Sequence, residues 1–225
     1  MTAPFPLSIA AMFRQGWSGY IRNIVPLTVG AAATFAVYGV FRVLAQRALD
    51  DGQQIASIFL DLVGLVLAGT VALPWYRYAL GAARSEPIDL AAPWRGGSGF
   101  SAQFVCAFWF WAAFMLGLRY LLGVPSILAV LFYGFHGYVV ADRAAKGGLR
   151  ALGTSVRLGH KRRVALFAVL ALFIVFNLVA ALPLGYGVTA LPVAVSVAAF
   201  TATGSVTLVS GACLYDVLSD RLDEQ

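Results

Sequence analysis

The sequence predicts an all-α integral membrane protein, and three observations support that class. Hydrophobic residues make up 60% of the chain and charged residues 12%, against about 25% charged in ordinary soluble domains. The mean hydropathy is +0.82. Six apolar stretches are long enough to cross a bilayer as helices. We therefore expect a single polytopic membrane domain over residues 1–225, with six transmembrane helices as three hairpins and with interfacial amphipathic helices.

The N-terminal segment, residues 7–22, is too polar to span a membrane and lacks the cleavage-site character of a signal peptide. Its apolar residues nevertheless recur at helical spacing: Ile9, Met12, Phe13, Trp17 and Tyr20. This pattern predicts a short interfacial helix that Trp17 and Tyr20 anchor at headgroup depth.

The first hairpin is expected to comprise spans at about 24–44 and 55–80, joined by a charged turn at Gly52. Pro74 should bend the second span, because proline removes a helical hydrogen bond. Residues 84–100 contain two prolines and three glycines and are expected to form an extramembrane loop. Within it, the GGSG sequence at 96–99 is typical of a linker.

The second hairpin is expected at about 102–122 and 126–145, where the latter span is long enough only if it continues to residue 145 as one helix. The third comprises about 164–182 and 193–214, followed by a short acidic tail from Asp216. Small residues form an i, i+4 stripe on the last span, which predicts close helix packing. The stripe consists of Ala199, Thr203, Thr207 and Gly211.

A basic segment separates the second and third hairpins. It holds seven of the sixteen lysines and arginines: Arg143, Lys146, Arg150, Arg157, Lys161, Arg162 and Arg163. Leu149, Leu152 and Val156 fall on one helical face, so we expect a basic amphipathic cytoplasmic loop over 146–163 that lies in the membrane interface. Because this charge lies between apolar spans, anionic lipid headgroups or a partner membrane protein are the expected ligands, and nucleic acid is not.

The distribution of basic residues predicts the orientation. With six spans and both termini in the cytoplasm, only Arg42, Arg47 and Arg119 of the sixteen lysines and arginines fall outside. Cytoplasmic loops carry the excess of positive charge, so both termini and the basic segment are expected to be cytoplasmic.

A few polar residues lie within the apolar spans. Asp61 is expected to pair with Arg42 or Arg119, either as a structural clamp or as a proton, ion or anionic-headgroup site that opens outward. His136 is expected to be a packing residue that bonds to a carbonyl or hydroxyl group, and Asn177 interrupts the fifth span.

Motifs of known enzymes are missing from the sequence. It has no G-x-S-x-G, no H-E-x-x-H and no phosphate-cradling glycine loop. The two histidines lie in different environments, so no metal site is expected. Cys106 and Cys213 both lie within apolar runs and are expected to be small buried hydrophobic residues, and no cofactor is implied.

Three stretches, FRQGWSGYIRNIVPL, VVADRAAKGGLRALGTSVRLGHKRRVALF and LYDVL, resemble a bacterial multi-span family. It is the membrane domain of glycerophosphoryl diester phosphodiesterases, with its sibling uncharacterised integral-membrane families. The resemblance is strongest at Asp142 and at the pattern Ala151-Leu152-x-x-Ser155 ahead of a basic run. It implies a location in the bacterial inner membrane and this architecture. It implies no hydrolase activity, because the spans occupy the residues that a catalytic domain would need.

The expected function is that of a non-enzymatic membrane scaffold or accessory subunit. It would engage anionic lipid, a partner membrane protein or a second copy of the chain through the basic loop. The alternative is a transporter or lipid-handling component with its site at Asp61, Arg42 and Arg119.

Overall fold

The chain is helical throughout the part that the computed structural model describes, residues 8–95, 97–143, 145–160, 162–186 and 189–223, and these ranges contain no strand. The helices are α1 Ile9–Arg22, α2 Ile24–Asp50, α3 Gln54–Val71, α4 Leu73–Arg84, η1 Ala92–Trp94, α5 Gly97–Tyr120, α6 Val124–Tyr133, α7 His136–Ala141, α8 Gly148–Leu158, α9 Arg163–Leu178, η2 Val179–Tyr186 and α10 Ala190–Asp223. The expected all-α class is confirmed.

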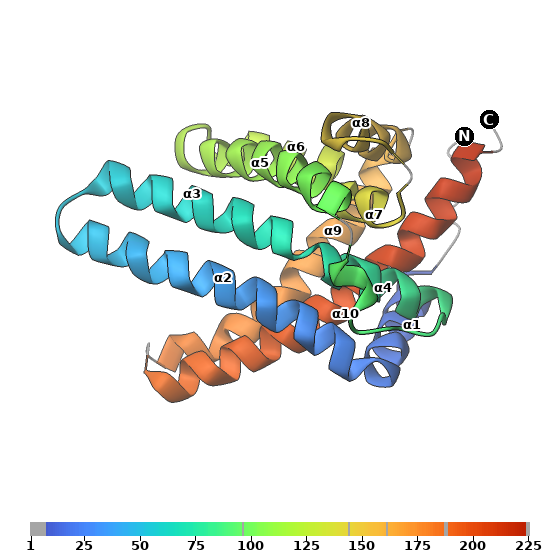
Figure 1. The fold of residues 1–225 in the computed structure, drawn as a ribbon, viewed down its shortest axis with the longest axis horizontal. Coiled ribbons are helices and arrows are strands. Elements are labelled where there is room, and N and C mark those ends of the chain that lie inside the picture. The colour runs from blue at the N-terminus through green and yellow to red at the C-terminus, as the bar shows by residue number, and fades with distance from the viewer. Residues whose placement is uncertain (1–7, 96, 144, 161, 187–188, 224–225) are drawn as a thin grey trace.

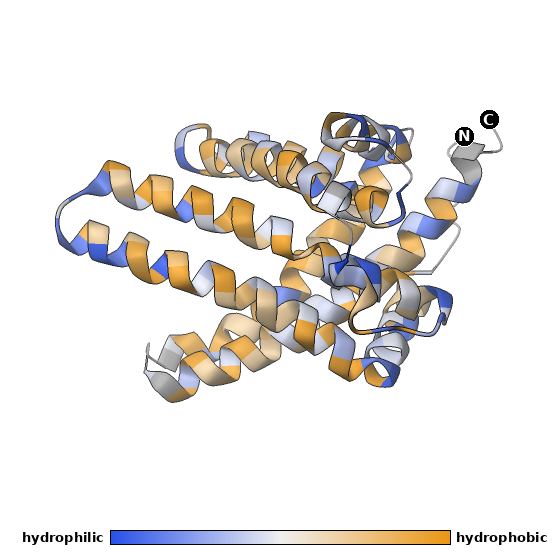
Figure 2. Cartoon of the chain, in the orientation of Figure 1, coloured by the Kyte–Doolittle hydropathy of each residue, from blue (hydrophilic) through white to orange (hydrophobic). Residues whose placement is uncertain are grey.

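Among the described residues, six helical segments are long and apolar enough to cross a membrane, as the sequence predicted. They are Ile24–Asp50, Gln54–Arg84, Gly99–Tyr120, Val124–Ala141, Arg163–Gly185 and Leu191–Asp220. Consecutive segments form three hairpins: α2 with α3–α4, α5 with α6–α7, and α9–η2 with α10 (Figure 1). The turn ends of the three hairpins point to one end of the molecule, and α1 and the C-terminal end of α10 lie at the other (Figure 1). Apolar residues cover most of the length of these helices, and polar residues gather near their ends (Figure 2).

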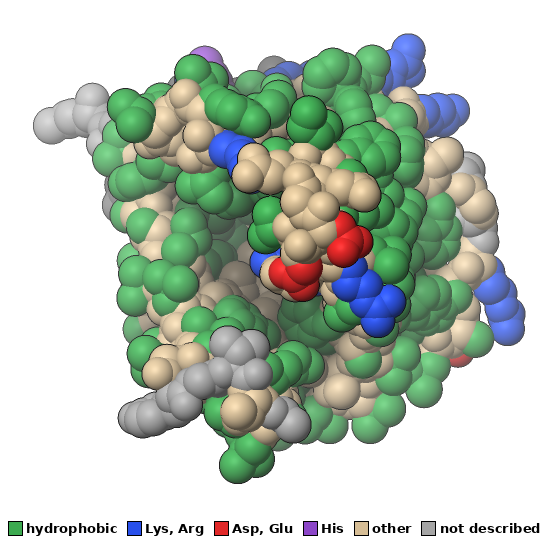
Figure 3. Space-filling view, turned by 90° about the vertical axis from the view of Figure 1, so that its left-hand side faces the viewer, with side chains coloured by type: hydrophobic (Ala, Val, Ile, Leu, Met, Phe, Trp, Pro, Cys, Tyr) green, Lys and Arg blue, Asp and Glu red, His purple; other side chains and the backbone are tan. Residues whose placement is uncertain are grey.

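The two ends of the molecule are packed differently. The buried core lies mainly at the end that carries the termini, around α1, α4, α7, α8 and the C-terminal half of α10, where Tyr78, Val139 and Tyr215 are almost completely buried. Large apolar side chains nearer the hairpin turns, such as Val43 and Phe59, are exposed. Seen from the turn end, the surface is mostly hydrophobic, with a hollow beside a small group of charged side chains (Figure 3). The turn ends of the hairpins are therefore splayed apart, and lipid is the natural neighbour of these apolar side chains.

Helix α1 packs tightly on α10. A Cβ atom at Gly16 would lie 2.0 Å from Oγ of Ser210, and that hydroxyl donates to the carbonyl of Met12 over 3.2 Å. Trp17 is 54% exposed, as an interfacial anchor would be, but Tyr20 is buried in the core. Tyr20 therefore packs on the protein and does not face outward as Trp17 does. The close approach of the two helices at Gly16 brings the face of α1 that holds Tyr20 against the protein.

The second span bends where expected. Helix α3 ends at Val71, and α4 begins at Leu73, with Pro74 in its first turn. Proline is tolerated there because the first N–H groups of a helix have no partner within the helix. The span continues to Arg84, beyond the predicted end near residue 80.

The fourth span is broken, and it is shorter than predicted. Helix α6 ends at Tyr133, α7 begins at His136, and the helix stops at Ala141 instead of continuing to residue 145. Backbone groups freed by a break in the membrane need other partners. The Ser155 hydroxyl of α8 supplies them, since it donates to the carbonyl of Phe132 over 2.9 Å and accepts from the amide of Phe135 over 3.2 Å.

Three further boundaries differ from the prediction. Helix α5 begins at Gly97, so most of the expected GGSG linker is helical, and Gly99 lies against the guanidinium of Arg77. The fifth span continues from α9 into the 3₁₀ helix η2. Helix α10 continues to Asp223, so the acidic segment from Asp216 is part of a helix and not a separate tail.

Helix α8 forms within the basic segment, but only part of its predicted apolar stripe faces outward. Leu149 is 66% exposed, whereas Ala151 and Ser155 are completely buried. The small residues of this face allow a close approach to α5, because a Cβ at Gly148 would lie 2.6 Å from both the Ala102 carbonyl oxygen and Val105 Cβ. The predicted apolar stripe is therefore divided, because Leu152 packs on the protein and Leu149 faces outward.

Replacing Ser155 by alanine should destabilise the protein. The change leaves one buried carbonyl and one buried amide without partners, which costs about 1–3 kcal/mol. Thermal or denaturant-induced unfolding in detergent measures the loss. The matched control is Ser18→Ala, at an exposed position of α1. Equal stability of the two variants would show that Ser155 does not support the break in the fourth span.

Candidate functional site

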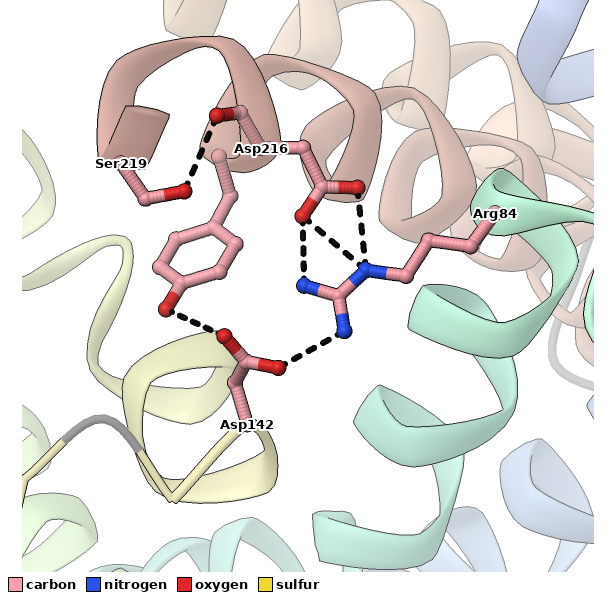
Figure 4. A network of polar contacts seen from close by, with 5 residues as sticks. Arg84, Asp142, Asp216 and Ser219 are labelled. Atoms are coloured by element: carbon pink, nitrogen blue, oxygen red, sulfur yellow. Dashed lines mark hydrogen bonds and ion pairs between the residues drawn. The ribbon is translucent and has the colours of Figure 1, made fainter. Parts of the chain in front are cut away.

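An ion network joins the three hairpins at the end that carries the termini. Arg84 is the last residue of α4, Asp142 directly follows α7, and Asp216 lies near the C-terminus of α10. Nη1 of Arg84 lies 2.7 Å from Oδ1 of Asp142, and Nη2 lies 2.6 Å from Oδ1 of Asp216. Arg84 Nε also contacts both oxygens of Asp216 at 3.2 Å (Figure 4). One guanidinium therefore bridges two carboxylates from different hairpins.

The network has further polar support. The Tyr215 hydroxyl donates to Oδ2 of Asp142 over 3.1 Å, and the Ser219 hydroxyl donates to the backbone carbonyl of Asp216 over 2.9 Å (Figure 4). The side chains of Arg84, Asp142 and Asp216 are 31%, 27% and 27% exposed. The network is therefore held in place on several sides but can still be reached from outside.

A hollow of about 730 Å³ borders this network. Its lining consists of Arg84, Glu86, Asp142, Thr154, Arg157, Leu158, Tyr215, Asp216, Ser219 and Asp220. Four carboxylates and two guanidinium groups thus face one space. Since Arg84 is already bonded to two of the carboxylates, the hollow has an excess of negative charge.

A second, basic cleft of about 500 Å³ lies along α8. It is lined by Ala145, Lys146, Arg150, Gly153, Thr154 and Arg157. These residues include three cations and no acid, so the cleft is strongly electropositive. Thr154 and Arg157 also line the hollow at the ion network, and Nη2 of Arg157 donates to the Thr154 hydroxyl over 3.3 Å.

The structure divides the seven basic residues that the sequence singled out. Lys146, Arg150 and Arg157 line the cleft, and Lys161 lies outside the described residues. Arg143 is exposed and has a left-handed backbone conformation with φ 55°. Arg163 stacks on Phe132, 4.6 Å from the ring centroid, and Nη1 of Arg162 is buried without a hydrogen-bond partner in the described part of the chain. The segment therefore does not act as one uniform basic surface.

Asp61 is paired, and its partner is Arg42. Nη1 of Arg42 lies 2.9 Å and 3.1 Å from the two carboxylate oxygens of Asp61, with side-chain exposures of 49% and 19%. Asp61 lies seven residues inside α3, about 10 Å along the helix from its start. Arg119 is exposed at the end of α5 and forms no ion pair with any described residue. The expected three-residue group is therefore a neutral pair within the first hairpin.

The other two polar residues of the spans serve as internal links. Nδ1 of His136 is 2.6 Å from the carbonyl oxygen of Tyr133, across the break in the fourth span. The amide of Asn177 in α9 donates to the hydroxyl of Thr207 in α10 over 2.7 Å and to the carbonyl of Phe173 over 2.8 Å. Both therefore satisfy backbone or side-chain groups inside the protein.

The small-residue stripe of α10 contacts two neighbouring helices. Gly211 lies beneath Tyr138 of α7, since a Cβ there would be 2.4 Å from the tyrosine oxygen. Thr207 bonds to α9 through Asn177. Ala199 and Thr203 are partly buried, and the Thr203 hydroxyl bonds to the Ala199 carbonyl within α10. Close contact is thus concentrated at the C-terminal half of the stripe.

The described residues offer no set of side chains that suits a metal ion. In the described residues no group of three or more His, Cys, Asp or Glu side chains could hold a metal ion, and Arg84 lies between the two nearest carboxylates. Cys106 and Cys213 are buried as free thiols.

No protein-family model, no curated protein and no solved structure matches the sequence.

Sequence reasoning did not find the ion network. From the sequence, Arg84 is only the first residue of the predicted loop at 84–100, and Asp216 is the first residue of the predicted acidic tail. One signal was available: Arg84, Asp142 and Asp216 each stand at the same-side end of a different span. Charged residues at matching ends of several spans are candidates for a shared network.

Replacing Arg84 by glutamine should destabilise the protein more than any loss of a surface charge. Two partly buried carboxylates would face each other without a cation. We expect a cost of about 1–3 kcal/mol, which lies between the small contribution of an exposed ion pair and the larger loss when a buried pair is broken. Adding Asp216→Asn should recover part of this loss. Unfolding midpoints in detergent measure both effects, with Arg95→Gln as the control. An Arg84→Gln protein as stable as that control would contradict the bridging role.

Proposed function

We propose that this chain is a non-enzymatic scaffold or accessory subunit of the bacterial inner membrane that engages anionic lipid headgroups through the cleft along α8. The observation that carries this proposal is the lining of the cleft, in which three cations stand together with no acid. A phosphate group fits such a lining because it accepts several charge-assisted hydrogen bonds at once.

The location of α8 supports a lipid ligand. The helix lies between the end of the fourth span at Ala141 and the start of the fifth at Arg163, so it lies near the membrane surface. Leu149 is exposed next to the cleft-lining residue Arg150 and can contact acyl chains. Basic residues near a membrane surface contribute about 1 kcal/mol each to the attraction of anionic lipid.

The transporter alternative has weaker support. Arg42 and Asp61 neutralise each other, and a transport site needs groups that are free to exchange partners. A structural clamp explains the pair with fewer assumptions, since an unpaired charge in the membrane is costly.

The cleft should determine lipid retention. Changing Lys146, Arg150 and Arg157 together to glutamine should lower the affinity for phosphatidylglycerol by about 10- to 100-fold at low salt. Native mass spectrometry or titration of a fluorescent phosphatidylglycerol in detergent measures this. The matched control changes Arg14, Arg22 and Arg95 to glutamine, which removes the same charge elsewhere. Equal losses in the two variants would show that net charge, and not the cleft, attracts the lipid.

We also propose that the end with the termini faces the cytoplasm, because only Arg42, Arg47 and Arg119 of the sixteen basic residues belong to the other side. Gly153→Cys on α8 and Gln53→Cys at the first hairpin turn test this, since both positions are exposed. An impermeant maleimide added to intact cells should label position 53 and spare position 153 until the membrane is permeabilised. Labelling of position 153 in intact cells would reverse the orientation.

A further inference from the structure

The basic cleft and the acidic hollow adjoin each other and carry opposite charges, and we call the two spaces together the groove. Thr154 and Arg157 line both spaces, so the two meet at these side chains. Beyond Arg157, one end holds Lys146 and Arg150, and the other holds four carboxylates. A ligand that occupies the whole groove therefore meets cations at one end and anions at the other.

The acidic end carries negative charge that the described side chains do not neutralise. Arg84 is one cation between Asp142 and Asp216, so the network keeps a net charge of −1. Glu86 and Asp220 line the same hollow, and neither forms an ion pair with a described cation. Arg157 stands at the junction and is shared with the basic end. A second cation at this end would relieve the repulsion among the carboxylates.

The lining indicates which kind of cation fits. Carboxylate oxygens accept hydrogen bonds, and a primary ammonium group has three N–H donors to give them. A quaternary ammonium has none, and it is usually bound over the faces of several aromatic rings. The lining contains one ring, Tyr215, whose hydroxyl is already donated to Asp142. The acidic end therefore suits a primary ammonium.

We propose that the groove binds the headgroup of an aminophospholipid, with the phosphate at Lys146, Arg150 and Arg157 and the ammonium among Glu86, Asp220 and the ion network. This inference rests on the proposed lipid-binding function and adds selectivity for the headgroup. The ligand is a membrane lipid and not a soluble phosphoamine, because the groove lies along a helix between the ends of two spans and Leu149 of the same helix is exposed.

Lipids with identical acyl chains test the inference on the wild-type protein. Phosphatidylethanolamine and phosphatidylcholine carry the same charges, but only the former has N–H donors. In native mass spectrometry or competitive titration in detergent, the protein should retain phosphatidylethanolamine about fivefold better than phosphatidylcholine, the gain expected from a few exposed charge-assisted contacts. Equal retention of the two lipids would overturn the inference.

Substitutions at the acidic end test whether its carboxylates cause the preference for phosphatidylethanolamine. Glu86→Gln with Asp220→Asn should lower the preference for phosphatidylethanolamine to near unity and leave phosphatidylglycerol bound at least as well. These residues lie outside the ion network, so the fold should persist, and an unfolding midpoint checks it. The matched control is Asp50→Asn with Asp51→Asn at the opposite end of the molecule. An unchanged preference in the first double variant, or the same loss in the control, would overturn the assignment of the acidic end.

Two further measurements separate this inference from the function on which it rests. If the triple glutamine variant of the basic cleft loses phosphatidylglycerol while the wild type shows no preference for the amine, the proposed function stands and the headgroup selectivity fails. If that variant retains phosphatidylglycerol fully, the lipid-binding function itself fails. Soluble phosphoethanolamine at millimolar concentration should not displace the bound lipid. Displacement would show that the ligand is the soluble compound.

Discussion

A single guanidinium group joins all three hairpins by ion pairs at one end of the molecule. Arg84 comes from the first hairpin, Asp142 from the second and Asp216 from the third, and both ion pairs are shorter than 3 Å. The other ion pair of the described residues, Arg42 with Asp61, lies within the first hairpin and links it to neither neighbour. This difference agrees with the packing: the core lies at the end with the ion network, while the hairpin turns are splayed (Figure 1).

The position of the ion network at the ends of the spans lowers its cost in free energy. An isolated charge at mid-bilayer costs about 2.5–3.5 kcal/mol on insertion scales, whereas Arg84, Asp142 and Asp216 all stand at ends of spans, where water and headgroups reach them. Their partial exposure also keeps the uncompensated charge tolerable. The arrangement leaves an accessible hollow beside the α8 cleft, so the contact that holds the hairpins also forms one wall of the candidate site.

Pairs within a hairpin could be predicted, but contacts between hairpins could not. Arg42 and Asp61 lie nearly equal numbers of residues from the turn at Gly52, so antiparallel helices bring them to the same depth. That reasoning needs only the position of the turn. Asp142 and Asp216 are 58 and 132 residues from Arg84 in the chain. Their meeting depends on how each hairpin is rotated about its own axis, and hydrophobicity over a whole span does not specify that rotation.

The face that α8 buries illustrates a second limit of pattern reasoning. Helical spacing singled out Leu149, Leu152 and Val156 as the apolar face, on the assumption that large apolar side chains would be buried in the membrane interface. The fourth span, however, is broken and needs a hydrogen-bonding partner for its free backbone groups, and Ser155 provides it. Because Ser155 must face inward, Leu152 packs on the protein as well, and Leu149 stays exposed. The basic side chains of α8 are thereby left free to line the groove, so the requirement to satisfy one broken span also sets the charge of the candidate site.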